Sequence, residues 1–124
     1  MAKILIVEDH DKTRLTLYRR LERAGHEVVS VPTGFEGIEL LREGNFELVL
    51  LDFMMKGLNG MYTFEQMKVI RPDLPYVMMT AYAHSGLVKE FMHEGGVDFI
   101  VKPFGEDFEE RIERDLDQFY GTVA

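Results

Sequence analysis

Cysteine and tryptophan are absent from the 124 residues of this chain, and long apolar runs are lacking as well. Without cysteine, the chain can form no disulfide, thiol nucleophile or cysteine-ligated zinc site, and we expect a cytoplasmic protein. Without an apolar stretch of roughly 20 residues, no segment is expected to cross a membrane as a helix. The apolar stretch near the N-terminus is also too short for a signal peptide.

Basic residues are few compared with acidic ones, at 14 against 22, which gives a net charge of −8. Such a surface repels nucleic acids and anionic membranes, so we expect neither as a direct partner. Proline is also scarce, with four residues, and no linker or low-complexity tract divides the chain. The length suits one domain with a sizeable core, so residues 1–124 are expected to form a single domain.

Short apolar runs alternate with helical patterns along the whole chain. Strands are predicted at residues 4–7, 27–31, 48–51, 76–80 and 98–101. Helices are predicted at residues 11–24, 33–43, 59–69 and 105–120, with a further helix ending near residue 94. This alternation predicts an α/β fold: a flavodoxin-like (βα)5 doubly wound parallel sheet with strand order 2-1-3-4-5.

The spacing of apolar residues predicts which helical side chains point into the core. These side chains are Leu17, Leu21 and Ala24; Met61, Phe64 and Met67; Leu87, Val88, Phe91 and Met92; and Phe108, Ile112, Leu116 and Phe119.

Polar side chains stand at the carboxyl ends of four predicted strands, where α/β sheets bind ligands. Glu8 and Asp9 follow the first strand, Asp52 ends the third, Thr80 ends the fourth, and Lys102 follows the fifth. Three acids at one rim repel one another unless a cation joins them, and hard oxygen ligands suit Mg²⁺. An aspartate in such a place can act as a nucleophile and become an aspartyl phosphate. The lysine and the threonine could then stabilise phosphoryl oxygens.

Four segments carry a resemblance to a known family: ILIVEDH, LVLLDFMMKGLNG, PDLPYVMMTAY and DFIVKPF. In this order and at these spacings, the chain resembles the receiver domain of two-component response regulators, the CheY-like family. The resemblance covers essentially all of the chain. It implies a two-component phosphorelay function in which a phosphoryl group switches the domain.

The resemblance also implies roles for the acidic residues. Asp52 matches the phosphoacceptor, Asp9 the acid that binds Mg²⁺ directly, and Glu8 the acid that acts through a metal-bound water. Met54 matches the position that gives a backbone carbonyl to the metal. Lys56 departs from the proline that the family usually has there.

Further matches lie beyond the acids. Thr80 and Lys102 match the pair that grips the phosphoryl oxygens, and the bond between Lys102 and Pro103 matches a cis peptide. Phe99 matches an aromatic residue that turns inward on activation. Met54 and Tyr82 match the positions that flank the path of the hydrolytic water, and both are bulky here, so the phosphorylated form is expected to be long-lived.

The partners that the resemblance implies are a sensor histidine kinase or a histidine phosphotransfer protein. An output partner, or a C-terminal effector domain outside this chain, is expected to contact the helix that ends near residue 94, the strand at 98–101 and the last helix. A homodimer through that face is also expected. The contacts are predicted near Val88, Lys89, Phe99 and Glu109.

Other functional classes fit the residues less well. A pseudo-receiver that binds partners without phosphorylation typically lacks the acid pair, the acceptor or the lysine, all of which are present. An aspartyl phosphatase needs a second aspartate where Met54 stands. A flavodoxin-like flavoprotein needs a phosphate-binding loop after the first strand, where EDHDK would repel the anion. We therefore expect a phosphoacceptor and not an enzyme that turns over a separate substrate.

Overall fold

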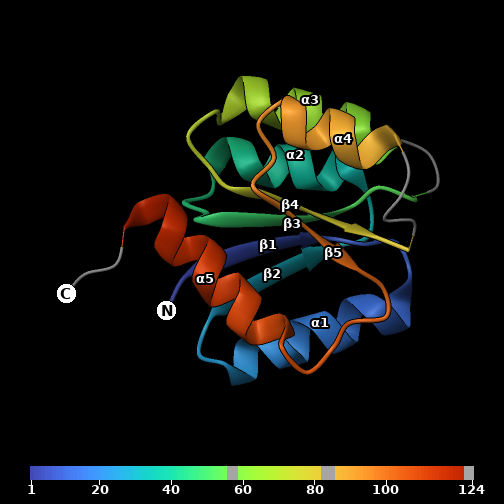
Figure 1. Cartoon of the computed structure of the whole chain (residues 1–124). Helices are drawn as coiled ribbons and strands as arrows, with labels where there is room; N and C mark the ends of the chain where they lie inside the picture. The colour runs from blue at the N-terminus through green and yellow to red at the C-terminus, as the bar shows by residue number, and fades with distance from the viewer. Residues whose placement is uncertain (56–58, 82–85, 122–124) are drawn as a thin grey trace.

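A computed structural model describes residues 1–55, 59–81 and 86–121. Within these residues five strands alternate with five helices (Figure 1). The strands are β1 (Lys3–Val7), β2 (Glu27–Val31), β3 (Leu48–Asp52), β4 (Tyr76–Thr80) and β5 (Asp98–Val101). The helices are α1 (Asp11–Arg23), α2 (Gly34–Glu43), α3 (Gly60–Ile70), α4 (Gly86–His93) and α5 (Phe108–Tyr120). No helix among the described residues is long and apolar enough to span a membrane.

The strands form one parallel sheet in the order β2-β1-β3-β4-β5, so the predicted fold class and strand order are confirmed. The helices α2, α3 and α4 cover one face of the sheet, and α1 and α5 cover the other (Figure 1). From β1 the chain passes outward to β2, and from β2 it crosses back past β1 to β3, on the other side of β1. The connections that leave β1 and β3 therefore run in opposite directions along the sheet, and a crevice forms between the carboxyl ends of these two strands. This is the point where open α/β sheets bind ligands.

Two apolar clusters lie on the two faces of the sheet because successive strand side chains point to opposite sides. Leu5, Val49 and Leu51 lie in the cluster that includes Phe64 of α3 and Phe91 of α4. Ile4, Ile6, Leu48 and Leu50 lie in the other cluster, with residues of α1 and α5. The central strands are therefore buried on both faces, and this explains their continuous apolar runs.

Some helical side chains that the periodicity placed in the core are exposed. Leu87 and Met92 are 38% and 39% exposed, because the short α4 meets the sheet through its other apolar side chains, Val88 and Phe91. Phe119 is 40% exposed and packs edge-to-face on the ring of Tyr120. Ala24 is also exposed, because it is the C-cap residue that follows α1. The other predicted inward residues of the helices are buried or partly buried.

The last helix begins at Phe108 and not at Gly105 as predicted. Arg20 of α1 donates a hydrogen bond to the Gly105 carbonyl and two to Glu109, and its guanidinium lies over the Phe108 ring. These contacts hold the segment before the helix in a turn that faces α1. Since Arg20 is far away along the chain, local helix signals could not reveal this turn.

Candidate functional site

Three acidic side chains meet where β1 and β3 end. The two strands are neighbours, with Val7 opposite Leu51, so the residues that follow them project from the same rim. Glu8, Asp9 and Asp52 each place one carboxylate oxygen within 4.8 Å of the others. The rim that the sequence predicted is therefore formed.

Asp52 is the last residue of β3 and is 1% exposed. Its Oδ1 accepts a hydrogen bond of 3.0 Å from the backbone N–H of Met54, and its Oδ2 lies 3.3 Å from the Lys102 ammonium. The backbone N–H of Phe53 donates to Met79 of β4 and keeps the chain in the sheet just beyond the acid. One carboxylate oxygen of Asp52 is thus directed to the loop and the other to the lysine.

Glu8 is completely buried and carries the strongest electrostatic perturbation at the rim. Its Oε1 lies 2.6 Å from the Lys102 ammonium, and its Oε2 accepts a hydrogen bond from the backbone N–H of His10. The pKa of Glu8 is raised to about 7, and burial is the largest cause. The neighbouring Asp52 also raises this pKa, by more than the hydrogen bond from Lys102 lowers it. The negative charge at this rim is therefore only partly balanced by the protein.

Lys102 and Thr80 are placed by the pairing of β4 with β5. Thr80 stands opposite Val101, and the backbone N–H of Lys102 donates to the Thr80 carbonyl. Burial lowers the pKa of Lys102, but its hydrogen bond to Glu8 and the charges of both buried acids outweigh burial, so the pKa is raised. The lysine is therefore a permanent cation at this rim. Its bond to Pro103 is cis, as predicted.

The remaining predicted positions lie around this cluster. Met54 has an exposed side chain, while its backbone is bound to Asp52. Phe99 is partly buried in β5 and packs against the cluster of α3 and α4. Lys56 and Tyr82 lie outside the described residues.

Some residues that support the rim were not singled out from the sequence. The Arg14 guanidinium donates to the Glu8 carbonyl and to Asp11, and so fixes the turn between β1 and α1. Gly60 begins α3 so close to β3 that an added Cβ would overlap Phe53 and lie 2.7 Å from the Asp52 carbonyl oxygen. In the sequence, a glycine after an asparagine cap only weakly indicates such a close approach, because it does not show which part of the fold lies against the glycine.

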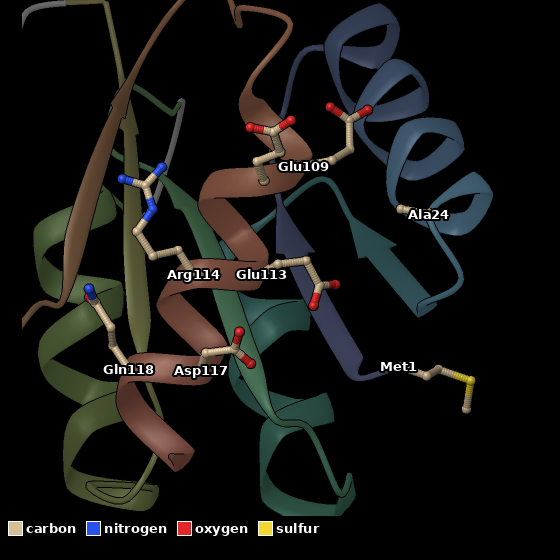
Figure 2. Close-up of a pocket in the computed structure, with 8 residues that line it drawn as sticks. Met1, Ala24, Glu109, Glu113, Arg114, Asp117 and Gln118 are labelled. Carbon is tan, nitrogen blue, oxygen red and sulfur yellow. The ribbon is translucent and has the colours of Figure 1, made fainter. Parts of the chain in front are cut away.

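Two of the surface hollows lie beside α1 or α5. A hollow of about 560 Å³ adjoins the rim and is lined by Lys12, Thr13, Thr16, Arg20, Ala81, Lys102, Pro103 and Phe104. A groove of about 820 Å³ lies away from the rim, between α5 and the start of the chain. Figure 2 shows Glu113 and Asp117 turned toward Met1 in this groove, while the Arg114 and Gln118 side chains extend on the opposite side of α5. The first hollow, with two lysines and an arginine, is the one suited to an anionic group.

Comparison with known proteins agrees with this geometry. The family model of the response regulator receiver domain matches residues 4–113. The response regulator protein FleR of Pseudomonas aeruginosa is 36% identical over 103 residues, which are 83% of this chain but 22% of that protein. Sporulation initiation phosphotransferase F of Bacillus subtilis is 30% identical, and the match covers 85% of each chain.

A solved structure of similar shape is the CheY-like response regulator receiver domain protein of Methanospirillum hungatei. It is 28% identical, covers 97% of each chain and has a TM-score of 0.91. Several curated relatives are much longer, and this chain spans about a quarter of their length, for example 24% of the transcriptional regulatory protein ZraR of Klebsiella oxytoca. The family match covers the fold and the whole rim, so the chain belongs to the response regulator receiver domains of two-component systems.

Proposed function

We propose that this receiver domain, taken as residues 1–124, accepts a phosphoryl group on Asp52 in a reaction that depends on Mg²⁺. The donor would be the phosphohistidine of a sensor histidine kinase or of a histidine phosphotransfer protein. The observation that carries the proposal is the cluster of Glu8, Asp9 and Asp52 within 4.8 Å, with the Lys102 ammonium beside it.

The donor set fits Mg²⁺. The carboxylates of Glu8, Asp9 and Asp52, with the backbone carbonyl of Met54, would hold the ion, and hard oxygen ligands are those it prefers. The raised pKa of Glu8, which arises from burial and from Asp52, marks negative charge that a divalent cation would relieve. When bound, the ion supplies positive charge that offsets the repulsion between the acids and a phosphoryl group.

The protein's own groups account for the remaining steps. An Asp52 carboxylate oxygen attacks the phosphorus, the P–N bond to the donor imidazole breaks, and its electron pair stays on the imidazole nitrogen. Lys102, now 3.3 Å from Asp52, donates to a phosphoryl oxygen, as does the Thr80 hydroxyl. The hollow beside Lys102 gives the donor room to approach.

The phosphorylated domain would signal through the face formed by α4, β5 and α5. Movement of Thr80 toward the phosphoryl group opens space that Phe99, now partly buried, would fill. Leu87 of α4 and Val101 of β5 are exposed apolar side chains on this face, 38% and 40% exposed. An output partner, an effector domain or a second copy of the domain would cover them, and the reaction would take place in the cytoplasm.

A pseudo-receiver has less support, because the acids, the acceptor and the lysine that such modules lack are all present and close together. The domain would also supply the groups for slow loss of its own phosphoryl group. It would not turn over a separate substrate.

Incubation with acetyl phosphate and Mg²⁺, followed by intact mass spectrometry, tests the proposal. We expect one added phosphoryl group in the wild type and in Asp73→Asn, a control at an exposed acid paired with Arg71. Asp52→Asn should abolish the addition. Full labelling of Asp52→Asn, or equal labelling in the presence of EDTA, would contradict the assignment.

A further inference from the structure

A second carboxyl pair lies on the α5 side of β5, away from the acids at the rim. Asp115 stands in the apolar stripe of α5, next to Leu116, and is 7% exposed. Its Oδ2 is buried and accepts no hydrogen bond from a donor among the described residues. Asp98, at the start of β5, lies within hydrogen-bonding reach of it. Two ionised carboxylates cannot bond to each other, because both only accept.

Asp98 already has donors for its negative charge. Its Oδ1 accepts a hydrogen bond of 2.7 Å from the Arg111 guanidinium and one of 2.8 Å from the Phe99 backbone N–H. The same Arg111 nitrogen donates to the Phe99 carbonyl at 2.8 Å. Asp98 is therefore the acid of the pair that stays ionised, and Asp115 is the acid that can carry a proton.

The surroundings favour a proton over any other cation in this place. The small cavity here is lined by Val97, Asp98, Asp107, Arg111, Arg114, Asp115 and Gln118. Its charged groups are thus three aspartates and two arginines, and the arginines oppose the entry of a further metal or ammonium ion. A protonated Asp115 donates to Asp98 and satisfies the orphaned oxygen without adding charge to the cavity.

We propose that Asp115 and Asp98 share one proton that fastens α5 to β5, and that loss of this proton in mildly alkaline solution loosens the two elements at Phe99. The two acids come from different elements, and both backbone polar groups of Phe99 belong to the same network. Proton binding here does not depend on phosphorylation at Asp52. It acts directly on the α4–β5–α5 face.

The electrostatics agree with this geometry. The pKa of Asp115 is raised to about 8: burial is the largest cause, the hydrogen bond and charge of Asp98 add to it, and Arg111 and Arg114 oppose the rise. The folded state therefore binds this proton where the unfolded chain does not. The linked stability is present at low pH and is lost as the pH rises toward the folded-state pKa.

The test is an NMR titration of the assigned side-chain carboxyls and of the Phe99 backbone amide. A Glu8→Gln background removes the other carboxyl that titrates near neutrality. We expect Asp115 to lose its proton near pH 8 and the Phe99 amide to shift with the same midpoint. An Asp115 midpoint below about 5, close to an ordinary aspartate, would overturn the proposal.

Two variants separate the shared proton from general effects of pH. Asp115→Asn keeps the shape and a donor toward Asp98, so the Phe99 shift near pH 8 should disappear while the fold is kept. Asp117→Asn, at an exposed acid of α5 that faces the other groove, should leave the shift unchanged. Asp98→Asn removes the neighbouring charge and should lower the Asp115 midpoint. A Phe99 shift that persists in Asp115→Asn, or an Asp115 midpoint unmoved in Asp98→Asn, would refute the shared proton.

Discussion

Lys102→Met should destabilise the domain, because it leaves the negative charges of two buried acids without a compensating cation. The ammonium lies 2.6 Å from Glu8 and 3.3 Å from Asp52, both almost fully buried. Methionine keeps the length of the side chain but removes the charge. Breaking a buried ion pair on one side typically costs about 3–5 kcal/mol, because the other charge stays buried without compensation. The Lys102 side chain is 23% exposed, so we expect the lower end, about 3 kcal/mol, at alkaline pH without metal.

The size of this loss should depend on pH, because Glu8 can take up a proton and so lose its uncompensated negative charge. Its pKa is raised to about 7 by burial and by Asp52, against the hydrogen bond from Lys102. Removing the lysine should raise that pKa further. When a carboxyl has a raised pKa in the folded state, the free energy of unfolding of the protein decreases as the pH rises toward that pKa. The variant should therefore lose less stability near pH 5, where Glu8 is protonated and only the contact with Asp52 is lost.

Urea denaturation followed by circular dichroism, with EDTA present, measures both values. Lys89→Met, at an exposed lysine of α4, is the matched control and should change stability little at either pH. Addition of Mg²⁺ at alkaline pH should restore part of the loss in Lys102→Met. An equal loss at both pH values, or no loss at alkaline pH, would refute the view that this lysine compensates Glu8.

Three further substitutions test other contacts. Tyr76→Phe removes a buried hydroxyl that donates to the carbonyls of Met67 and Arg71, and should cost about 1–3 kcal/mol in urea denaturation. Gly60→Ala places a methyl group against the Asp52 carbonyl. It should weaken the Mg²⁺-induced change in NMR shifts at the rim more than Gly86→Ala, whose Cβ would meet open space. Met54→Asn should speed the loss of the phosphoryl group from Asp52 by up to about tenfold, because an amide can orient water; equal decay would contradict this.

The positions of the strands, their order and the rim of acids could be predicted because they follow from local patterns. The run from Leu48 to Leu51 is apolar on both faces, which is typical of a central parallel strand. The Thr33 side chain caps α2 by accepting from the Glu36 backbone N–H, as its local sequence predicted. The acids converge because parallel strands end at the same edge of the sheet.

Features that depend on contacts across the fold could not be predicted. His26 is 4% exposed and accepts a hydrogen bond from the backbone N–H of Ala2. At Gly96 the Phe91 ring lies where a Cβ would be. Asp115 is buried although it lies among the charged residues of α5. In each case the contact depends on the fold, and the local sequence pattern does not indicate which residue lies nearby.

The network around Arg111 also bears on how copies of the domain can meet. β5 forms one edge of the sheet, and edge strands can recruit a strand of another molecule through their free backbone groups. At Phe99 the carbonyl accepts from Arg111 and the N–H donates to Asp98. An incoming strand would have to displace these side chains before it could extend the sheet. Copies of the domain that meet at this edge should therefore contact one another through side chains. Repeated addition of strands to the sheet, which leads to aggregation, is disfavoured.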